Sequence, residues 1–142
     1  MDSGVSIRQA SSQEIGELKL LVINDPDKSL CSVTRDCAGM REVVFLIDFK
    51  GETAGFITWR DSAQEIFPLA LFTPYRRRGI GTIAAKKFVQ IQCGRGVDRL
   101  IIDIVEGKED FWAKVFSGFN IEHIVDRKYY VYLTQAHHLK AQ

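Results

Sequence analysis

The chain has 142 residues, 46% of them apolar and 26% charged, and its 19 basic and 18 acidic side chains give a net charge of +1. A chain of this length can bury a core without disulfides or metal, so we expect one folded domain over residues 1–142. The longest apolar run, residues 43–47, is far shorter than the roughly 18 residues of a membrane-spanning helix, and no signal-peptide pattern is present, which excludes a membrane span and export.

The first 40 residues predict a strand followed by two helices. Residues 4–8 alternate apolar and polar side chains and indicate a strand. Ser11 and Glu14 have the spacing of a capping box, and apolar residues follow at helical intervals, so a helix begins here. Residues 25–27 break this helix, and residues 29–40 predict a second, less regular one.

Three strands follow. Residues 42–49 and 53–60 are rich in β-branched and aromatic side chains, and the turn at residues 50–52 makes them an antiparallel hairpin. Residues 65–72 predict the third strand. Pro68 cannot donate to a strand ladder, so this strand must lie at an edge, bulge, or separate from a neighbour.

The second half of the chain alternates helices and strands. The apolar period changes to about 3.6 residues at Gly79, which begins an amphipathic helix. Residues 99–105 are almost continuously apolar and predict a strand covered on both faces. A short helix at residues 109–116 and a hairpin of residues 121–125 and 129–133 complete the domain.

The resulting order is β-α-α-β-β-β-α-β-α-β-β. It predicts an α/β domain of the α+β type, with one mostly antiparallel sheet of about seven strands and four helices.

Cysteines and histidines are few and scattered. Cys31, Cys37 and Cys93 form no CxxC pair, and no histidine lies at metal-ligand spacing from them. We therefore predict reduced thiols, a cytoplasmic location and no metal ion.

Positive charge is concentrated in the middle of the chain. Residues 75–100 contain seven basic residues and one acidic residue. Such a local cluster favours a compact polyanion, such as a nucleotide cofactor, over nucleic acid, whose binding domains are more often basic throughout. A solvated basic helix face is the alternative interpretation.

An anion site is predicted within this region by the run Arg76-Arg77-Arg78-Gly79-Ile80-Gly81-Thr82. The glycines let main-chain N–H groups approach a phosphate, the helix N-terminus supplies unpaired donors, and the arginines add positive charge. A Walker loop is excluded because its pattern is absent. The Rossmann pattern fits residues 79–84, with Asp103 about twenty residues later, but three strands joined by short turns precede this loop where repeated βαβ units are required.

A third pattern, R/Q-x-x-G-x-G/A, is matched by Arg76, Gly79 and Gly81. With this motif and the predicted order of elements, the chain resembles the GNAT superfamily of N-acyltransferases over essentially its whole length. A strand that bulges and separates from its neighbour just before this loop is characteristic of the superfamily, and Pro68 is compatible with it. The resemblance implies a single acyl-CoA-binding domain and acetyl-CoA, or another acyl-CoA, as cosubstrate.

The resemblance also implies a cofactor site. Arg76 and the backbone amides of residues 77–82 would hold the pyrophosphate, and main-chain groups of Leu71 and Phe72 would pair with the pantetheine arm. An amide of one of these two residues would stabilise the oxyanion. The residues whose amides would take part are Arg77, Arg78, Gly79, Ile80, Gly81 and Thr82.

One position departs from the superfamily pattern. Trp112 stands where many members carry a tyrosine that protonates the departing thiolate. An indole N–H is not a usable acid, so Trp112 is expected to pack against the cofactor arm or the core. Solvent or one of Tyr129, Tyr130 and Tyr132 would then protonate the thiolate.

Two carboxylates are candidates for the base that deprotonates the amine. Glu65 lies eleven residues before Arg76, a spacing that resembles the histone-acetyltransferase branch of the superfamily. Asp103 lies in an apolar run, where a charged side chain needs a partner or a purpose. The alternatives are a solvated glutamate at a strand end and an aspartate that caps a helix or pairs with an arginine.

We therefore expect a cytoplasmic N-acyltransferase that acts on a primary amine of unknown size, as a monomer or homodimer. The rival prediction, based on Trp112, is a GNAT-like domain that binds CoA or a protein partner without turnover.

Overall fold

The computed structural model describes residues 3–35 and 41–133 of the chain. The elements in these residues are β1 (Val5–Gln9), α1 (Ser12–Asn24), β2 (Glu42–Phe49), β3 (Glu52–Arg60), β4 (Glu65–Leu71), the 3-10 turn η1 (Thr73–Tyr75), α2 (Ile80–Gly94), β5 (Arg99–Asp103), α3 (Glu109–Val115), β6 (Asn120–Val125) and β7 (Lys128–Tyr132). The strands form one seven-stranded sheet in the order β1-β2-β3-β4-β5-β7-β6. All neighbours are antiparallel except β4 and β5, which confirms the predicted class.

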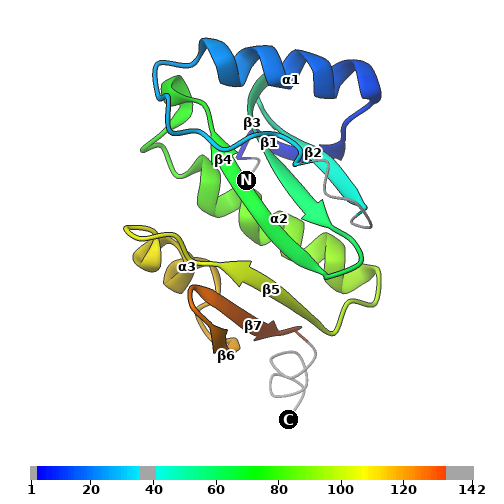
Figure 1. Ribbon diagram of the computed structural model, residues 1–142, viewed down its shortest axis with the longest axis vertical. Coiled ribbons are helices and arrows are strands. Elements are labelled where there is room, and N and C mark those ends of the chain that lie inside the picture. Colours follow the sequence, from blue (N-terminus) through cyan, green and yellow to red (C-terminus); the bar gives the residue numbers. More distant parts are fainter. Residues whose placement is uncertain (1–2, 36–40, 134–142) are drawn as a thin grey trace.

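Apolar side chains pack on both faces of the sheet, because successive side chains of a strand point to opposite sides. Phe45 and Ile47 of β2 belong to the larger cluster, which contains the buried face of α2. Val44 and Leu46 belong to the second cluster, with Leu18 of α1. Figure 1 accordingly shows α1 and α2 separated by β1 to β4.

The predicted start of α1 is confirmed in atomic detail. The Ser11 side chain accepts a hydrogen bond from the Glu14 amide at 3.2 Å, and the Glu14 carboxylate accepts one from the Ser11 amide at 2.9 Å. Two amides that a helix start leaves without partners are satisfied in this way.

The irregularity predicted from Pro68 is a bulge in an internal strand. The register runs from Trp59 opposite Ile66 to Ile57 opposite Leu69, so Phe67 and Pro68 together face one residue of β3. On its other side, β4 pairs with β5 at two positions only, Glu65 with Ile101 and Ile66 with Ile102. Beyond Ile66 the two strands part, and β5, β7 and β6 form the lower part of the molecule in Figure 1.

The second predicted helix, residues 29–40, is wrong in its described part. Residues 29–35 contain no helix, and residues 36–40 lie outside the described residues. Asp27 Oδ1 accepts hydrogen bonds from the amide and the hydroxyl of Ser29, a local turn that competes with helix formation. Val33 is instead buried against the sheet, and its carbonyl accepts a hydrogen bond from Thr58. The described residues therefore contain three α-helices where four were predicted.

The strand predicted at residues 99–105 is shorter and is covered on one face. β5 ends at Asp103, with Leu100 and Ile102 buried and Ile101 only half-buried. Successive side chains of a strand point to opposite sides, so Arg99, Ile101 and Asp103 share the face that is exposed or half-buried. The apolar composition of residues 99–105 does not distinguish a strand covered on both faces from a strand covered on one.

Candidate functional site

A cleft of about 660 Å³ lies where β4 and β5 part. Its floor is formed by residues 66–71 of β4, and one end by the loop and first turn of α2. The segment after α1 and the segment from Asp103 to α3 form the two sides. The lining residues outside β4 are Asp27, Ser29, Leu30, Cys31, Arg76, Arg77, Gly79, Gly81, Thr82, Asp103, Val105, Lys108, Phe111, Trp112 and Lys114.

The glycine loop presents unpaired main-chain donors at this end of the cleft. The first backbone bond at the start of α2 is from the Ile83 amide to the Gly79 carbonyl. Within residues 3–35 and 41–133, none of the six amides of residues 77–82 donates to a protein acceptor. Such a row of donors at a helix N-terminus fits the oxygens of a phosphate or diphosphate.

The geometry favours glycine at both motif positions, for different reasons. Gly79 has φ +78° and is the N-cap of α2, a left-handed conformation that side chains disfavour. Gly81 has ordinary helical geometry, but a Cβ there would lie 3.3 Å from both Leu71 Cδ1 and Phe111 Cε1. Since Leu71 and Phe111 line the cleft, a larger side chain at position 81 would narrow it.

The three arginines of the run point to different places. Arg77 lines the cleft and has φ +61°, a strained conformation for a side chain of this size. Arg78 does not line the cleft, and its guanidinium lies 4.9 Å from the centre of the Phe49 ring. Two further residues predicted to bind the cofactor lie outside the cleft lining: Ile80, buried in the core, and Phe72, which packs against Phe56.

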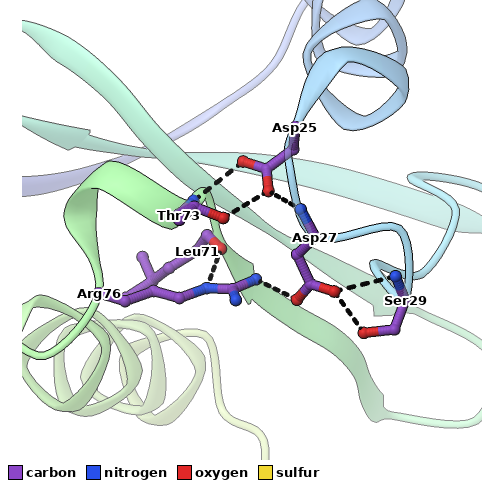
Figure 2. A network of polar contacts seen from close by, with 6 residues as sticks. All are labelled: Asp25, Asp27, Ser29, Leu71, Thr73 and Arg76. Carbon is purple, nitrogen blue, oxygen red and sulfur yellow. Dashed lines mark hydrogen bonds and ion pairs between the residues drawn. The ribbon is translucent and has the colours of Figure 1, made fainter.

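Arg76 joins two loops (Figure 2). Its Nε donates to the Leu71 carbonyl at 3.0 Å, and its Nη2 lies 2.8 Å from Asp27 Oδ2. The guanidinium therefore holds the segment after α1 against the end of β4, and much of its hydrogen-bonding capacity is used within the protein. Arg76 and Arg77 both line the cleft, and Arg76 in addition connects two of its sides.

Asp25 makes a second connection between the same two loops (Figure 2). Its Oδ2 accepts from the Thr73 amide at 2.9 Å, and its Oδ1 accepts from the Thr73 hydroxyl at 2.6 Å. Burial raises the pKa of Asp25, but the hydrogen bonds from Thr73 and from the Asp27 amide outweigh it, so the pKa lies below its usual value. Together, Asp25 and Asp27 fix one side of the cleft.

Asp27 gives this connection a measurable pH dependence. Hydrogen bonds from the Ser29 side chain and amide, then from Arg76, lower the pKa of Asp27 from 3.8 to about 2. Because the folded-state pKa is depressed, the stabilisation is present above pH 3.8 and is lost as the pH falls towards about 2. We expect Asp27→Asn to unfold at lower urea concentration than the wild type at neutral pH, with the difference shrinking through this interval. A difference that does not change with pH would contradict the ionic role.

The two candidate bases occupy different environments. Asp103 lines the cleft, its side chain is 11% exposed, and its Oδ1 lies 3.0 Å from Arg127 Nε. Glu65 is not part of the cleft lining. It is 2% exposed and lies between Arg60 Nη1 at 3.6 Å and Lys128 Nζ at 3.2 Å. A solvated Glu65 at a strand end is therefore ruled out, and of the two candidate bases Asp103 is the one that lines the cleft.

Trp112 both lines the cleft and packs in the core. It is 6% exposed and stacks on Phe116, with ring centroids 5.7 Å apart and an interplanar angle of 10°. All four tyrosines lie in the described residues, and none lines the cleft. Tyr132, for example, donates to Glu122 on the outer strand β6.

Several cleft residues were not predicted from the sequence. Residues 27–31 form one side of the cleft, although residues 25–27 were interpreted only as a helix break. Lys108, Phe111 and Lys114 come from α3 and the turn before it. The paired acidic residues around Pro26 were a usable signal, since aspartates before a turn commonly accept local hydrogen bonds.

The described residues also bear on metal and membrane binding. Among them, no three His, Cys, Asp or Glu side chains are placed to hold a metal ion. None of the helices in the described part of the chain has the length and apolar character that crossing a bilayer requires.

Comparison of this chain with known proteins finds similarity in three-dimensional structure and none in sequence families or curated proteins. The sequence matches no protein-family model and no curated protein. The structure is similar to the ribosomal-protein-S18-alanine N-acetyltransferase of Escherichia coli, with a TM-score of 0.61 and 17% identity over 89% of this chain and 90% of that one. It is also similar to the PaiA N-acetyltransferase of Thermoplasma acidophilum, solved with coenzyme A (TM-score 0.62, 13% identity, 92% and 98% covered). An acetyltransferase of the GNAT family from Staphylococcus aureus gives a TM-score of 0.61 at 13% identity, with 91% and 99% covered.

The fold predicted from the motif and the order of elements is thereby confirmed: the chain has the GNAT fold. At these identities the comparison establishes the fold and leaves the roles of single residues to the geometry of the cleft.

Proposed function

We propose that the protein is an N-acyltransferase that moves an acetyl or other short acyl group from CoA to a primary amine. The observation that carries this proposal is the position of the six amides of residues 77–82, which donate to no acceptor in the described part of the chain. They lie at one end of a cleft that continues between two parted strands. CoA, a diphosphate that carries a long and narrow pantetheine arm, matches a cleft of this shape. The neighbours of the same fold include acetyltransferases, one of them solved with coenzyme A.

The residues present fit such a cosubstrate. The amides of residues 77–82 would bind the pyrophosphate, with Arg77 adding charge and Thr82 a hydroxyl at the same end. Leu71, Phe111 and Trp112 offer apolar surface along the cleft. Gly81 leaves the space that an arm passing between Leu71 and Phe111 requires.

We propose the Leu71 amide as the group that stabilises the oxyanion. The Phe72 amide donates to the Ala54 carbonyl at 2.9 Å and so points towards β3. Amides alternate in direction along an antiparallel strand, so the Leu71 amide points away from β3, towards the cleft. Of the two donors considered from the sequence, Leu71 is therefore the one we assign to the developing negative charge.

Asp103 is the group we assign to amine deprotonation. A lysine-like ammonium with a pKa of about 10.4 is neutral in roughly one molecule per thousand near pH 7.4, which costs about 4 kcal/mol. The bound acyl-CoA supplies the activated thioester, and the free amine attacks its carbonyl carbon. The Asp103 carboxylate, directly or through one water, accepts the proton that the ammonium must lose. No tyrosine reaches the cleft to protonate the thiolate, so we assign that step to solvent.

The closest rival is a domain that binds CoA without turnover. Trp112, in place of a tyrosine acid, supports it. The two proposals differ in one measurement: CoA thiol is released from acetyl-CoA in the presence of an acceptor amine only if the protein is an enzyme. Mass spectrometry of the purified protein would identify a copurifying CoA and its acyl chain.

A glycine substitution tests the cleft itself. We expect Gly81→Val to weaken acetyl-CoA binding by about tenfold to a hundredfold, because its side chain meets Leu71 and Phe111. Gly94→Val is the matched control, since a Cβ at the other end of α2 meets nothing within 4 Å. Isothermal titration calorimetry measures both affinities. Equal affinity for the Gly81 variant and the wild type would contradict binding in this cleft.

The wider assignment follows from the same site. We propose that residues 1–142 act as one acyl-CoA-binding domain, as a monomer or homodimer in the cytoplasm. A protein N-terminus is one acceptor to consider, because one structural neighbour is named for an alanine of ribosomal protein S18. Nucleic acid remains a less favoured partner.

A further inference from the structure

Two ion pairs lie next to each other where β4 and β5 part. In each pair the carboxylate is largely buried and the cation is largely exposed. Asp103 is 11% exposed and its partner Arg127 is 56% exposed. Glu65 is 3% exposed and its partner Lys128 is 39% exposed. Asp103 and Lys128 are register partners in β5 and β7, so the two pairs are neighbours. The solvent-exposed groups at this place are therefore the positively charged side chains, and the carboxylates are buried under them.

This charge arrangement conflicts with a simple amine as acceptor. An acceptor ammonium must approach Asp103, which lines the cleft. Arg127 already lies on that carboxylate, with Nε 3.0 Å from Oδ1 and Nη2 3.3 Å from Oδ2. The turn that carries Arg127 is fixed to β5 by the hydrogen bond from the Ile104 amide to the Arg127 carbonyl, at 2.8 Å. A lone ammonium would therefore enter beside a like charge whose main chain is held in place.

A carboxylate on the acceptor removes the conflict. A guanidinium has five N–H donors, and Arg127 directs two of its nitrogens at Asp103, which leaves donors for a second anion. The buried Arg60 shows the same arrangement in this protein, since it lies between Glu42 and Glu65. An acceptor that carries both charges can place its ammonium on Asp103 and its carboxylate on Arg127.

We propose that the acceptor is an amine with a carboxylate close to the amino group, and that Arg127 selects it. This inference rests on the proposed acyl transfer. The proton of the acceptor ammonium passes to Asp103, and the neutral amine attacks the thioester carbonyl carbon. As the C–N bond of the amide forms, the C–S bond breaks, CoA leaves as the thiolate, and the second amine proton passes to solvent, which also protonates the thiolate. Arg127 is a specificity residue that does not take part in the proton transfer. The carboxylate belongs either to a free amino acid or to an acidic second residue of a peptide.

The experiment compares matched acceptors. One pair is a free amino acid and its amide, and the other is a peptide with aspartate at the second position and the same peptide with asparagine. We expect wild-type kcat/KM to favour the carboxylate member of at least one pair by about tenfold, mainly through KM. The pair that shows the preference identifies the source of the carboxylate. Arg127→Gln should abolish the preference, and Arg127→Lys should retain part of it.

Arg99→Gln is the matched control. Arg99 is a cation on the same strand as Asp103, four residues earlier, and stacks on Tyr130 at 4.0 Å. The Arg99→Gln variant should keep the preference for the carboxylate acceptor. The affinity for acetyl-CoA should be unchanged in this variant and in both Arg127 variants. Turnover of both members of each pair at equal kcat/KM, or a preference that survives in Arg127→Gln, would overturn this inference and leave acyl transfer in place. Turnover of no acceptor by a protein that binds CoA would overturn both.

Discussion

Asp103→Asn is expected to lower kcat by about a hundredfold to ten-thousandfold while acetyl-CoA affinity stays within about twofold of the wild type. The amide keeps the size of the side chain but cannot accept the proton of an ammonium. Asp103 is not one of the residues to which we assign cosubstrate binding, so we expect that binding to be unaffected. Release of CoA thiol gives the rate, and calorimetry gives the affinity. The remaining rate should also rise with pH, because more of the free amine is then present without a base.

Glu65→Gln is the comparison that makes this result decisive. Glu65 is buried between two cations and does not line the cleft. Its neutralisation leaves Arg60 and Lys128 without their shared anion, so the loss should be in the free energy of unfolding, by about 3 kcal/mol. If Glu65→Gln keeps wild-type stability and loses more rate than Asp103→Asn, the base is Glu65 and the assignment of Asp103 is wrong.

Much of the fold was predictable because local signals and the fold agree. The capping box at Ser11 and Glu14 gave the start of α1, and the change of apolar period at Gly79 gave the start of α2. Pro68 indicated an irregular strand, and the structure has a bulge at that position. These features depend on a few neighbouring residues, which is why a single sequence contains them.

The parts that could not be predicted depend on contacts between distant residues. Nothing local in residues 29–35 shows that Val33 is buried against the sheet in place of a helix. The motif suggests that Arg76 holds the pyrophosphate, but its geometry depends on Asp27, 49 positions earlier, and on the Leu71 carbonyl. Likewise, the eleven-residue spacing of Glu65 could not show that Lys128 and Arg60 surround it.

Gly55 is a further position whose importance only the structure shows. It lies in β3 opposite Leu71, at the end of β4 that forms the floor of the cleft. A Cβ at Gly55 would lie 2.1 Å from the Ala70 carbonyl oxygen and 3.0 Å from Leu71 Cα. These are main-chain atoms of a paired strand, so they cannot move aside without separating β3 from β4.

We therefore expect Gly55→Ala to lower the free energy of unfolding by about 3 kcal/mol, which corresponds to a fall in Tm of roughly 10 °C. Acetyl-CoA affinity should fall with it, because the displaced strand carries Leu71. Gly16→Ala is the matched control: its Cβ meets nothing within 4 Å on α1, and alanine should raise stability by about 0.5–1 kcal/mol through its helix propensity. Thermal unfolding followed by circular dichroism compares the two. The same substitution thus has opposite signs at two glycines, and a Gly55→Ala protein as stable as the wild type would show that β3 and β4 are not in the close contact described here.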